Sequence, residues 1–311
     1  MKNSNELSIH SRCDIDGMRW IGGGVFDMGS EEFYPEERPV RSVKVEGFWM
    51  DVTPVTNGEF KKFVNETGYI TVAERVPLPE DYPGVESELL IPGSLVFRSP
   101  SADSIVHGPD DWWFYVPGAC WHKPDGVLAL QPDDVYKPVV QVCYEDALAF
   151  ATWNGKRLPT ESEWEFAARG GMQNKDYAWG DTFLPGGRIL ANTWEGNFPF
   201  KDDMKTSAFY GTSPVGTFPA NPYGLFDMIG NVWEWTSDQW MLNYATSQKT
   251  CCLSETNKKK MFEKKVLKGG SHLCASNYCH RYRPAARIAQ MTDSATSHIG
   301  FRCAKDYPII E

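Results

Sequence analysis

Hydrophobic and polar positions make short, strand-like stretches at the start of the chain. The pattern predicts strands at residues 20–21, 25–28 and 43–45, with the glycines at 22–24 forming a tight turn between the first two. A phosphate-binding loop is the other interpretation of a glycine run. It is disfavoured here because the lysine and the Ser or Thr that such a loop requires do not follow the glycines.

Further along the chain, the spacing of apolar residues changes to that of an amphipathic helix. Thr56 and Glu59 form a capping box, in which a threonine hydroxyl and a glutamate three residues later satisfy exposed backbone N–H groups. Phe60 and Phe63 then fall on one helical face, and Gly68 ends the helix. The pattern therefore predicts a helix that begins after Thr56 and packs through its phenylalanines.

Two more helices are predicted by similar signals. One runs over residues 144–153, where alanines and a leucine make an apolar stripe and Gly155 follows the end. The other opens with a second capping box, Thr160 and Glu163, and stops at Gly170. Three helices among many short strands indicate the α+β class.

Residues 75–138 show no regular period and are rich in proline, glycine, aspartate and aromatic residues. A stretch of this length inside a domain is typically functional or disordered. Its density of aromatic rings favours an irregular but ordered and packed excursion. No change of composition marks a linker, so we expect a flexible tail at 1–14 and one loop-rich domain at 15–311.

Composition narrows the classes of function. The 311 residues carry 31 Lys and Arg against 41 Asp and Glu, a formal net charge of −10, which argues against a general nucleic-acid binder. No stretch of 18 apolar residues exists, so no membrane span is expected. The polar N-terminus lacks the apolar core of a signal peptide, and we expect a cytoplasmic monomer.

Cys274 and Cys279 are the most suggestive pair for chemistry. Their spacing leaves three interpretations open: a local disulfide, half of a zinc site, or a two-thiolate site for a soft monovalent metal such as Cu(I). The spacing by itself favours a disulfide or free thiols. Basic neighbours would favour thiolates, because a nearby positive charge lowers the pKa of a thiol. These neighbours are His272, His280, Arg281 and Arg283.

The other histidines give little support for a metal site. His10, His107 and His122 are far apart in sequence, and no HExxH pair exists. A G-x-S-x-G nucleophile elbow is absent as well. We therefore expect these histidines to be ordinary surface or core residues.

Two turns rich in Asn, Asp and Glu are candidates for calcium. The stretches 192–195 and 227–235 combine carboxylate and amide side chains with the carbonyls of tight turns, and Ca²⁺ prefers such hard oxygen donors. Asn and Asp also favour turns without any metal. From the spacing alone, turn formation is the better interpretation.

Five motifs together resemble the formylglycine-generating enzymes, the sulfatase-modifying oxidases. They are GGVFDMG at 23–29, VTPVTN at 52–57, GKRLPTESEWE at 155–165, GLFDMIGNVWEW at 224–235 and GFRC at 300–303. These motifs mark a wider superfamily that also includes non-oxidase members. The discriminating stretch is 274–287, Cys-x4-Cys-x-Arg-Tyr-Arg-x-Ala-Ala-Arg, which resembles the catalytic segment of the true formylglycine generators.

The resemblance implies a fold, a cofactor and a reaction. The fold is a single loop-rich domain related to C-type lectins. The cofactor is one Cu(I), which Cys274 and Cys279 would hold. The reaction converts a cysteine in a Cys-x-Pro-x-Arg segment of an unfolded or nascent sulfatase-type polypeptide to Cα-formylglycine with O₂. Ser271 and Trp233 match positions that line the oxygen and copper pocket, and Tyr278 matches a pocket tyrosine.

The resemblance also implies two structural Ca²⁺ sites. The first would use Asn192 with the carbonyls of Thr193 and Phe209, and the second Asp227 and Glu234 with the carbonyls of Gly230 and Val232. At the first site, Ser207 stands where a ligand aspartate is usual, and Asp202 or Asp203 is the alternative donor.

Two rival functions stay open. One is a non-catalytic binding module of the same superfamily, and the paired cysteines count against it. The other is an iron-dependent thiol oxidase like the sulfoxide synthases, whose histidine spacing this chain lacks. His298 is a departure within the site itself, because the family has an active-site asparagine at this position.

Overall fold

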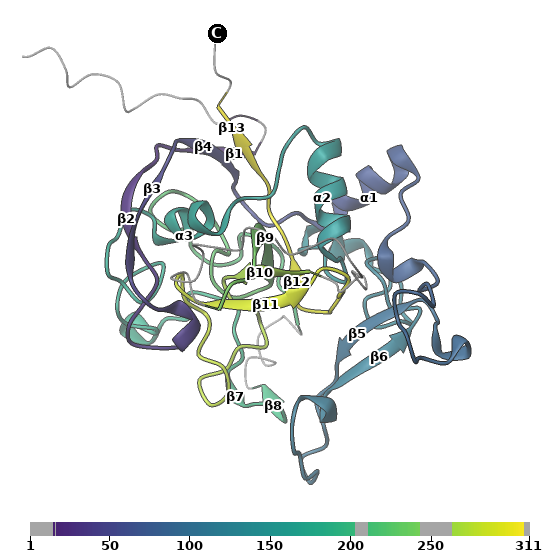
Figure 1. The fold of residues 1–311 in the computed structure, drawn as a ribbon. Helices are drawn as coiled ribbons and strands as arrows, with labels where there is room; N and C mark the ends of the chain where they lie inside the picture. The colour runs from purple at the N-terminus through teal and green to yellow at the C-terminus, as the bar shows by residue number, and fades with distance from the viewer. Residues whose placement is uncertain (1–14, 16, 203–210, 243–262, 308–311) are drawn as a thin grey trace, which may run out of the picture.

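The computed structural model describes residues 15, 17–202, 211–242 and 263–307 (Figure 1). The tail expected at 1–14 lies outside the described residues. Within them, the α-helices are α1 (Asn57–Thr67), α2 (Tyr144–Trp153) and α3 (Glu161–Arg169). Short 3-10 helices connect other elements: η1 (Pro35–Glu37), η2 (Val72–Glu74), η3 (Ser87–Leu89), η4 (Pro109–Asp111), η5 (Pro132–Tyr136) and η6 (Pro185–Gly187).

The strands are short and belong to small sheets. They are β1 (Met18–Ile21), β2 (Gly24–Met28), β3 (Arg41–Val45), β4 (Phe48–Asp51), β5 (Gly93–Phe97), β6 (Trp113–Pro117), β7 (Gly196–Asn197), β8 (Lys201–Asp202), β9 (Trp233–Gln239), β10 (Lys264–Lys268), β11 (Arg287–Met291), β12 (Ile299–Gly300) and β13 (Ala304–Asp306). Few helices with many short strands and long loops confirm the predicted α+β class.

Helix α1 begins and ends where its sequence signals predict. The Glu59 backbone N–H donates to the Thr56 hydroxyl at 3.2 Å, and the Thr56 N–H donates to the Glu59 carboxylate at 2.8 Å. Gly68 ends the helix in the left-handed conformation, with φ +67°. Phe60 and Phe63 are buried, so α1 packs into the core through its predicted face.

The other two helices are confirmed at their predicted positions. The Glu163 N–H of α3 donates to the Thr160 hydroxyl at 3.2 Å, and Gly170 closes the helix with φ +58°. Helix α3 is buried along most of its length, and Trp164 is completely enclosed. Helix α2 packs against α1, where the Phe150 ring lies 5.9 Å from that of Phe60.

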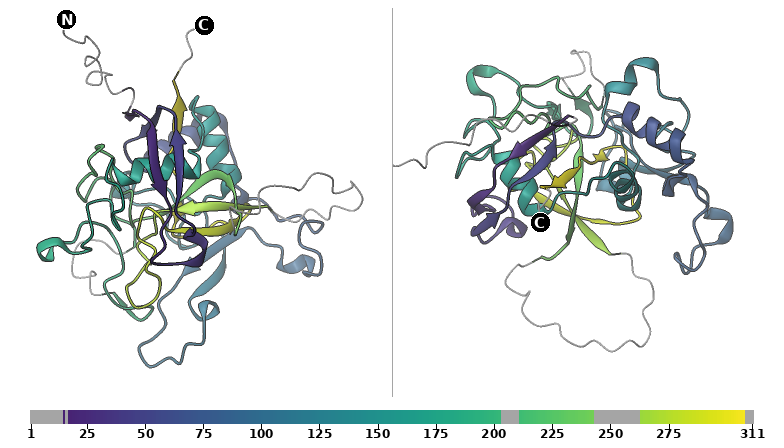
Figure 2. Two further views of the ribbon diagram at one scale, coloured as in Figure 1. Left: turned by 60° about the vertical axis from the view of Figure 1, so that its left-hand side comes forward. Right: turned by 90° about the horizontal axis from the view of Figure 1, so that it is seen from above.

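The predicted N-terminal strands are confirmed and build two of the sheets. β1 and β13 both pair antiparallel with β4, which joins the two ends of the described chain at one side of the molecule (Figure 2). β2 pairs antiparallel with β3. The turn before β2 needs glycine, because a Cβ on Gly23 would lie 2.6 Å from the Val45 carbonyl oxygen.

Strands β9 to β12 form the sheet at the centre of the molecule (Figure 1). β10 pairs antiparallel with β9 and β11, whereas β12 runs parallel to β9 and places Ile299 opposite Trp233. β9 begins at Trp233, and the chain that leaves β10 enters the stretch 269–279. The sheet therefore brings together two segments that contain predicted site residues.

The expectation that residues 75–138 are irregular is wrong for part of the segment. β5 and β6 pair antiparallel inside it and form a hairpin. The many prolines, glycines and aspartates around these strands conceal their pattern in the sequence. The hairpin is tied to the C-terminal region, since the Leu95 N–H donates to the Ala295 carbonyl and the Ser297 N–H donates to the Leu95 carbonyl, each at 3.1 Å. The segment is thus ordered and packed, as its aromatic content predicts.

Large aromatic residues and several ion pairs share the interior. Trp164 and Trp235 are fully buried, and so are the charged side chains of Lys268 and Arg302. Each buried cation has an acidic partner, because an unpaired charge in the interior is costly. Of the helices that the structure describes, none is long and apolar enough to cross a lipid bilayer.

Candidate active site

Two consecutive glycines set the path of the loop that carries the cysteine pair. Gly269 and Gly270 have φ of +94° and +75°. A Cβ on Gly270 would lie 2.8 Å from the backbone oxygen of Arg281, and one on Gly269 would lie 2.9 Å from the Trp164 ring. Only glycine fits such a close approach at positive φ. The loop therefore leaves β10 in one fixed direction.

Cys274 and Cys279 meet on this loop. Their sulfur atoms lie 3.0 Å apart, which is too long for a disulfide bond of about 2.05 Å, and both are free cysteines. The Cys279 N–H donates to the Ala275 carbonyl at 2.9 Å, and this turn brings the second cysteine back to the first. Cys274 is buried and Cys279 is partly exposed. The local disulfide is therefore not formed in this structure.

The two thiols have opposite electrostatic environments. The hydrogen bond between the pair lowers the pKa of Cys279, and the positive charge of Arg281 lowers it further. Burial raises the pKa of Cys274 well above its ordinary value. Ionisation is therefore favoured at Cys279 and disfavoured at Cys274.

The basic neighbours do not all act on the cysteines. Arg281 does, while its guanidinium also binds Glu36 at 2.6 Å and lies 3.7 Å from the Tyr34 ring centre. Arg283 is instead engaged in a buried ion pair with Glu37. Sequence reasoning missed the acidic and aromatic partners because they come from the distant segment 34–37.

The surroundings of the nearby histidines lower their pKa values and so favour the neutral ring. Burial lowers the pKa of His272 to about 4, and its Nδ1 lies 2.9 Å from the Asn231 carbonyl oxygen. Burial, together with the proximity of His272, lowers the pKa of His298 to about 3. Burial also lowers the pKa of His280. The expected positive contribution of His272 and His280 to the thiols is therefore wrong.

The structure places Ser271 beside Cys274 and Trp233 in the same hydrophobic cluster. The Ser271 N–H lies 3.4 Å from the Cys274 sulfur, and the Ser271 hydroxyl accepts a hydrogen bond from the Leu273 N–H at 3.2 Å. Trp233 is 3% exposed and belongs to the same hydrophobic cluster as Cys274. Ser271 is thus in direct contact with the sulfur pair, and Trp233 belongs to the core that encloses Cys274.

Tyr278 lies on the outer side of the cysteine loop. It is 50% exposed and stacks on the Phe198 ring, with ring centres 4.4 Å apart. Trp112, which immediately precedes β6, meets the Tyr278 ring edge-on at 5.7 Å. Neighbouring Trp113 packs on the His298 ring at 4.7 Å. The β5–β6 segment, which the sequence did not predict to contain strands, therefore supplies Trp112 and Trp113. Together with Tyr278, Phe198 and His298 they form the aromatic wall of the site.

A cavity of about 390 Å³ opens beside the cysteine loop. Its walls include His272 and Leu273 from this loop, Trp194, and Phe97 from β5. The two thiols themselves do not line it. The cavity thus adjoins the sulfur pair without containing it.

The donor set at the sulfur pair fits Cu(I). In the described part of the chain, no group of three or more Cys, His, Asp or Glu ligand atoms gathers around these sulfurs. Structural zinc takes four ligands, and non-haem iron takes histidine and carboxylate, whereas soft thiolates select Cu(I). Cys274 and Cys279 therefore have the chemistry of a two-sulfur site for a soft ion.

The candidate ligands of the second calcium site lie in one buried region. Burial raises the pKa of Asp227 to about 6, and its carboxylate accepts a hydrogen bond from the Gly216 N–H at 2.7 Å. Glu234 is held by Arg302, with distances of 2.7 and 2.8 Å, and by the Trp164 indole N–H at 2.8 Å. The proposed carbonyl donors, Gly230 and Val232, lie between Asp227 and Glu234 in the sequence, and both residues are buried.

The first calcium site is described only in part. Phe209, Ser207 and Asp203 lie outside the described residues. The Asn192 side-chain amide donates to the Gly211 carbonyl at 2.9 Å, so its oxygen is the atom left for a cation. Asp202 accepts a hydrogen bond from the Glu195 N–H at 3.2 Å, close to Thr193 in the chain. These oxygens are of the hard type that Ca²⁺ takes.

Comparison with known proteins gives a consistent result. A family model described as the sulfatase-modifying factor enzyme 1-like domain matches residues 4–307. The formylglycine-generating enzyme of Mycobacterium tuberculosis is 50% identical over 290 residues, which covers 92% of this chain and 96% of that protein. The inactive C-alpha-formylglycine-generating enzyme 2 of Bos taurus is 38% identical over 297 residues, covering 91% of this chain and 86% of that protein.

Among solved structures, PvdO from Pseudomonas aeruginosa is similar in fold. The TM-score is 0.60 at 22% sequence identity, over 93% of this chain and 94% of that chain. An identity this low carries the fold and nothing further. The fold expected from the sequence is thereby confirmed.

Proposed function

Because the chain belongs to the family of the sulfatase-modifying factor enzyme 1-like domain, we propose that it generates formylglycine in a sulfatase-type polypeptide. In detail, it oxidises the cysteine of a Cys-x-Pro-x-Arg segment to Cα-formylglycine, with O₂ as the acceptor and one Cu(I) as the cofactor. The observation that carries this proposal is the pair of free sulfurs of Cys274 and Cys279, 3.0 Å apart.

Each residue around the sulfur pair has a defined task in this proposal. Cys274 and Cys279 hold Cu(I), which when bound supplies the redox chemistry for O₂ activation. The Arg281 guanidinium offsets the negative charge that two thiolates bring. The Ser271 N–H donates to the Cys274 sulfur and fixes its direction. Buried Trp233 contributes to the hydrophobic cluster that encloses Cys274.

The substrate cysteine undergoes a two-electron oxidation. O₂ accepts one hydrogen from its Cβ and one from its sulfur and becomes hydrogen peroxide, which leaves a thioaldehyde. Water then adds to the thioaldehyde carbon, and the sulfur leaves as hydrogen sulfide. Tyr278 faces outward beside Phe198 and offers a ring against which the peptide can pack. The adjoining cavity of about 390 Å³ offers space to residues that flank the substrate cysteine.

The two calcium sites are part of the proposal as structural elements. A Ca²⁺ at Asp227 would offset a carboxylate whose pKa burial raises to about 6. It would also stabilise a turn that has little regular structure. Asn192, with its amide nitrogen already engaged, would serve the first site. Chelation with EGTA is then expected to lower the melting temperature.

Mass spectrometry tests the proposed reaction directly. Copper-loaded protein is incubated with a Cys-x-Pro-x-Arg peptide under O₂, and the expected product is lighter by about 18 Da, whereas each step of ordinary thiol oxidation adds mass. The Cys274→Ser and Cys279→Ser variants lose both turnover and tight Cu(I) binding. The matched control is Cys143→Ala, which removes a buried thiol elsewhere and retains the product peak.

Three results would overturn the proposal. Stoichiometric Cu(I) binding by the double cysteine variant would refute the assigned ligands. An unchanged peptide after copper loading would favour a non-catalytic binding module, a possibility that the inactive relative keeps open. Purified protein that contains iron and no copper would favour the iron-dependent thiol oxidase.

A further inference from the structure

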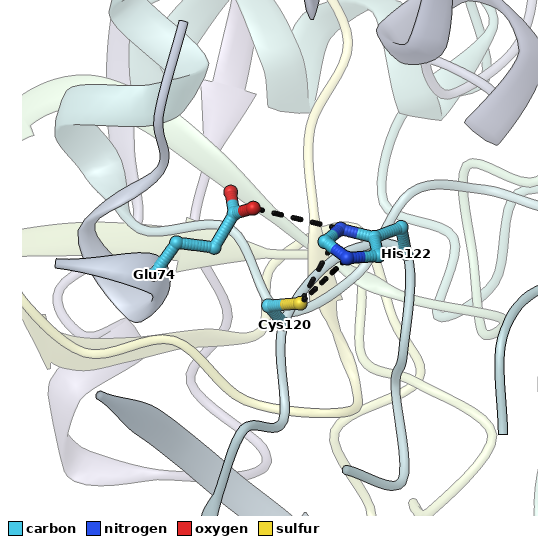
Figure 3. A group of neighbouring side chains, drawn as sticks. All are labelled: Glu74, Cys120 and His122. Atoms are coloured by element: carbon cyan, nitrogen blue, oxygen red, sulfur yellow. Dashed lines mark hydrogen bonds and ion pairs between the residues drawn. The ribbon is translucent and has the colours of Figure 1, made fainter. Parts of the chain in front are cut away.

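A second group of metal-ligand side chains lies away from the cysteine loop. Glu74, Cys120 and His122 point toward one another (Figure 3), and their ligand atoms all lie within 4.8 Å of each other. The His122 Nδ1 atom is 3.4 Å from the Cys120 sulfur and 3.6 Å from the Glu74 Oε1 atom. The function proposed above uses none of the three.

Local structure already orients each member of this group. The second oxygen of Glu74, Oε2, accepts hydrogen bonds from the Thr71 N–H at 3.0 Å and the Thr71 hydroxyl at 2.6 Å, which leaves Oε1 directed at His122. Cys120 and Lys123 exchange backbone hydrogen bonds of 3.0 and 3.1 Å across a tight turn. Such supporting contacts are what holds a metal ligand in place.

The distances from the His122 Nδ1 atom to the other two ligand atoms match tetrahedral coordination. Zinc bonds of about 2.3 Å to sulfur and about 2.0–2.2 Å to nitrogen or oxygen put neighbouring ligand atoms roughly 3.4–3.6 Å apart. The distances from Nδ1 to the Cys120 sulfur and to the Glu74 Oε1 atom, 3.4 and 3.6 Å, fall in this range. We propose that Glu74, Cys120 and His122 form a zinc site, with water as the fourth ligand.

Charge and access agree with a divalent ion. One thiolate and one carboxylate carry two negative charges, which Zn²⁺ neutralises. Cys120 is only 4% exposed, so its sulfur is poorly placed to attack a substrate as a nucleophile. The His122 side chain is 40% exposed and leaves a path from solvent to the site.

The position of the site in the fold indicates what zinc would do. Glu74 ends η2 before the β5–β6 hairpin begins, and Cys120 follows shortly after the hairpin ends. A metal bound to Glu74 and Cys120 would cross-link the two ends of the segment 74–120. Such a cross-link lowers the conformational entropy of the unfolded chain. The same segment contains Trp112, which packs on Tyr278, and Trp113, which packs on His298. Zinc therefore stabilises the position of Trp112 and Trp113 beside the candidate active site without binding there itself.

The test needs a background from which the thiol pair of the active site has been removed. Full-length Cys274→Ser/Cys279→Ser protein is stripped with chelator and titrated with Zn²⁺ against a competing indicator. We expect one equivalent to bind and the melting temperature to rise. Co²⁺ in place of zinc is expected to give a thiolate-to-metal charge-transfer band.

Ligand variants in this background decide the assignment. Cys120→Ser and His122→Ala should each weaken zinc binding by more than the roughly 10–100-fold that loss of a supporting contact costs. Cys143→Ser is the matched control, since Cys143 lies in the same small hydrophobic cluster as Cys120 but outside the ligand group. It should retain both zinc and the Co²⁺ band.

The proposal fails if the background protein takes up no zinc, or if Cys120→Ser and His122→Ala bind it as tightly as the background does. Circular dichroism confirms that each variant is folded. Substitution of the buried Cys120 could destabilise the fold. His122 is partly exposed, so His122→Ala tests the site even in that case. Because these proteins lack Cys274 and Cys279, the result is independent of the proposed oxidase activity.

Discussion

His298 shows at the scale of one residue how burial changes a titrating group. Its ring nitrogen lies 2.8 Å from the Thr296 hydroxyl, and its ring packs on Trp113 at 4.7 Å. Burial and the neighbouring His272 lower its pKa from 6.5 to about 3. The native state therefore resists protonation that the unfolded chain accepts near its ordinary pKa.

This difference predicts how His298 affects stability as the pH falls. The unfolded state binds the extra proton below about pH 6.5, so the free energy of unfolding decreases by up to ~1.4 kcal/mol per pH unit until the native ring also protonates near pH 3. His298→Asn should flatten urea-unfolding profiles measured between pH 7 and 4. An unaltered slope for His298→Asn would contradict the prediction.

At the scale of elements, two glycines with similar φ have different surroundings. Gly68 ends α1 with φ +67° and has open space where a Cβ would lie. Gly270 has φ +75°, but its Cβ would lie 2.8 Å from the Arg281 oxygen and 3.0 Å from the Tyr282 Cα. These obstacles are backbone atoms, which cannot rotate away as a side chain can.

The contrast predicts a graded loss of stability. Gly68→Ala should cost about 1–2 kcal/mol, the strain of placing an L-residue in the left-handed region. Gly270→Ala adds the clash and should cost roughly 3 kcal/mol or more, a range that core disruption reaches. It should also lower formylglycine production, because the loop that holds Ser271 moves. Chemical denaturation measures the unfolding free energies of the two variants, and the peptide assay measures their formylglycine production. Equal losses would contradict the role given to the backbone contact.

The elements could be predicted where the signal is local. The capping boxes at Thr56 and Thr160 fix helix starts through bonds to residues three positions later, so the sequence contains the whole cause. The β5–β6 hairpin could not be predicted, because Leu95 in β5 bonds to Ala295 and Ser297 at the other end of the chain. Such pairing depends on the fold and leaves no local period.

The candidate site was predictable to a similar extent. Motif resemblance identified Cys274 and Cys279, and the structure brings their sulfurs together. The charge environment could not be read from neighbours in sequence, since Arg283 is engaged by Glu37 and Arg281 is shared with Glu36. Both acids lie in η1, far from the cysteine loop along the chain.

At the scale of the whole molecule, buried ion pairs join segments that are distant in sequence. Glu165 in α3 binds Lys268 of β10 at 2.8 Å and Arg169 at 2.6 Å, and it also accepts a hydrogen bond from the Gly29 N–H at 2.8 Å. Lys268 directly precedes the two glycines that set the cysteine loop. This cluster therefore connects the N-terminal strands, α3 and the central sheet behind the candidate site.

Glu165 gives the molecule a predictable response to acid. Burial alone raises the pKa of Glu165, but the charges of Lys268 and Arg169 outweigh it and lower the pKa from 4.5 to about 2. The native carboxylate stays ionised while the unfolded one takes up a proton near its ordinary pKa. Stability from this group is therefore complete above about pH 4.5 and is lost as the pH falls toward 2, by up to ~1.4 kcal/mol per pH unit.

Glu165→Gln should remove this pH dependence and also lower the unfolding free energy. At neutral pH the variant should lose about 3–5 kcal/mol of unfolding free energy, because Lys268 and Arg169 keep their buried charges without the carboxylate. Between pH 4.5 and 2 its unfolding free energy should fall less steeply than that of the parent chain. Glu46→Gln is the matched control: Glu46 pairs with Lys44 at 2.6 Å, but both side chains are more than two-thirds exposed, so loss of this pair should leave the unfolding free energy almost unchanged. Urea titrations across this pH range would refute the assignment if Glu165→Gln and the parent chain lost stability in parallel.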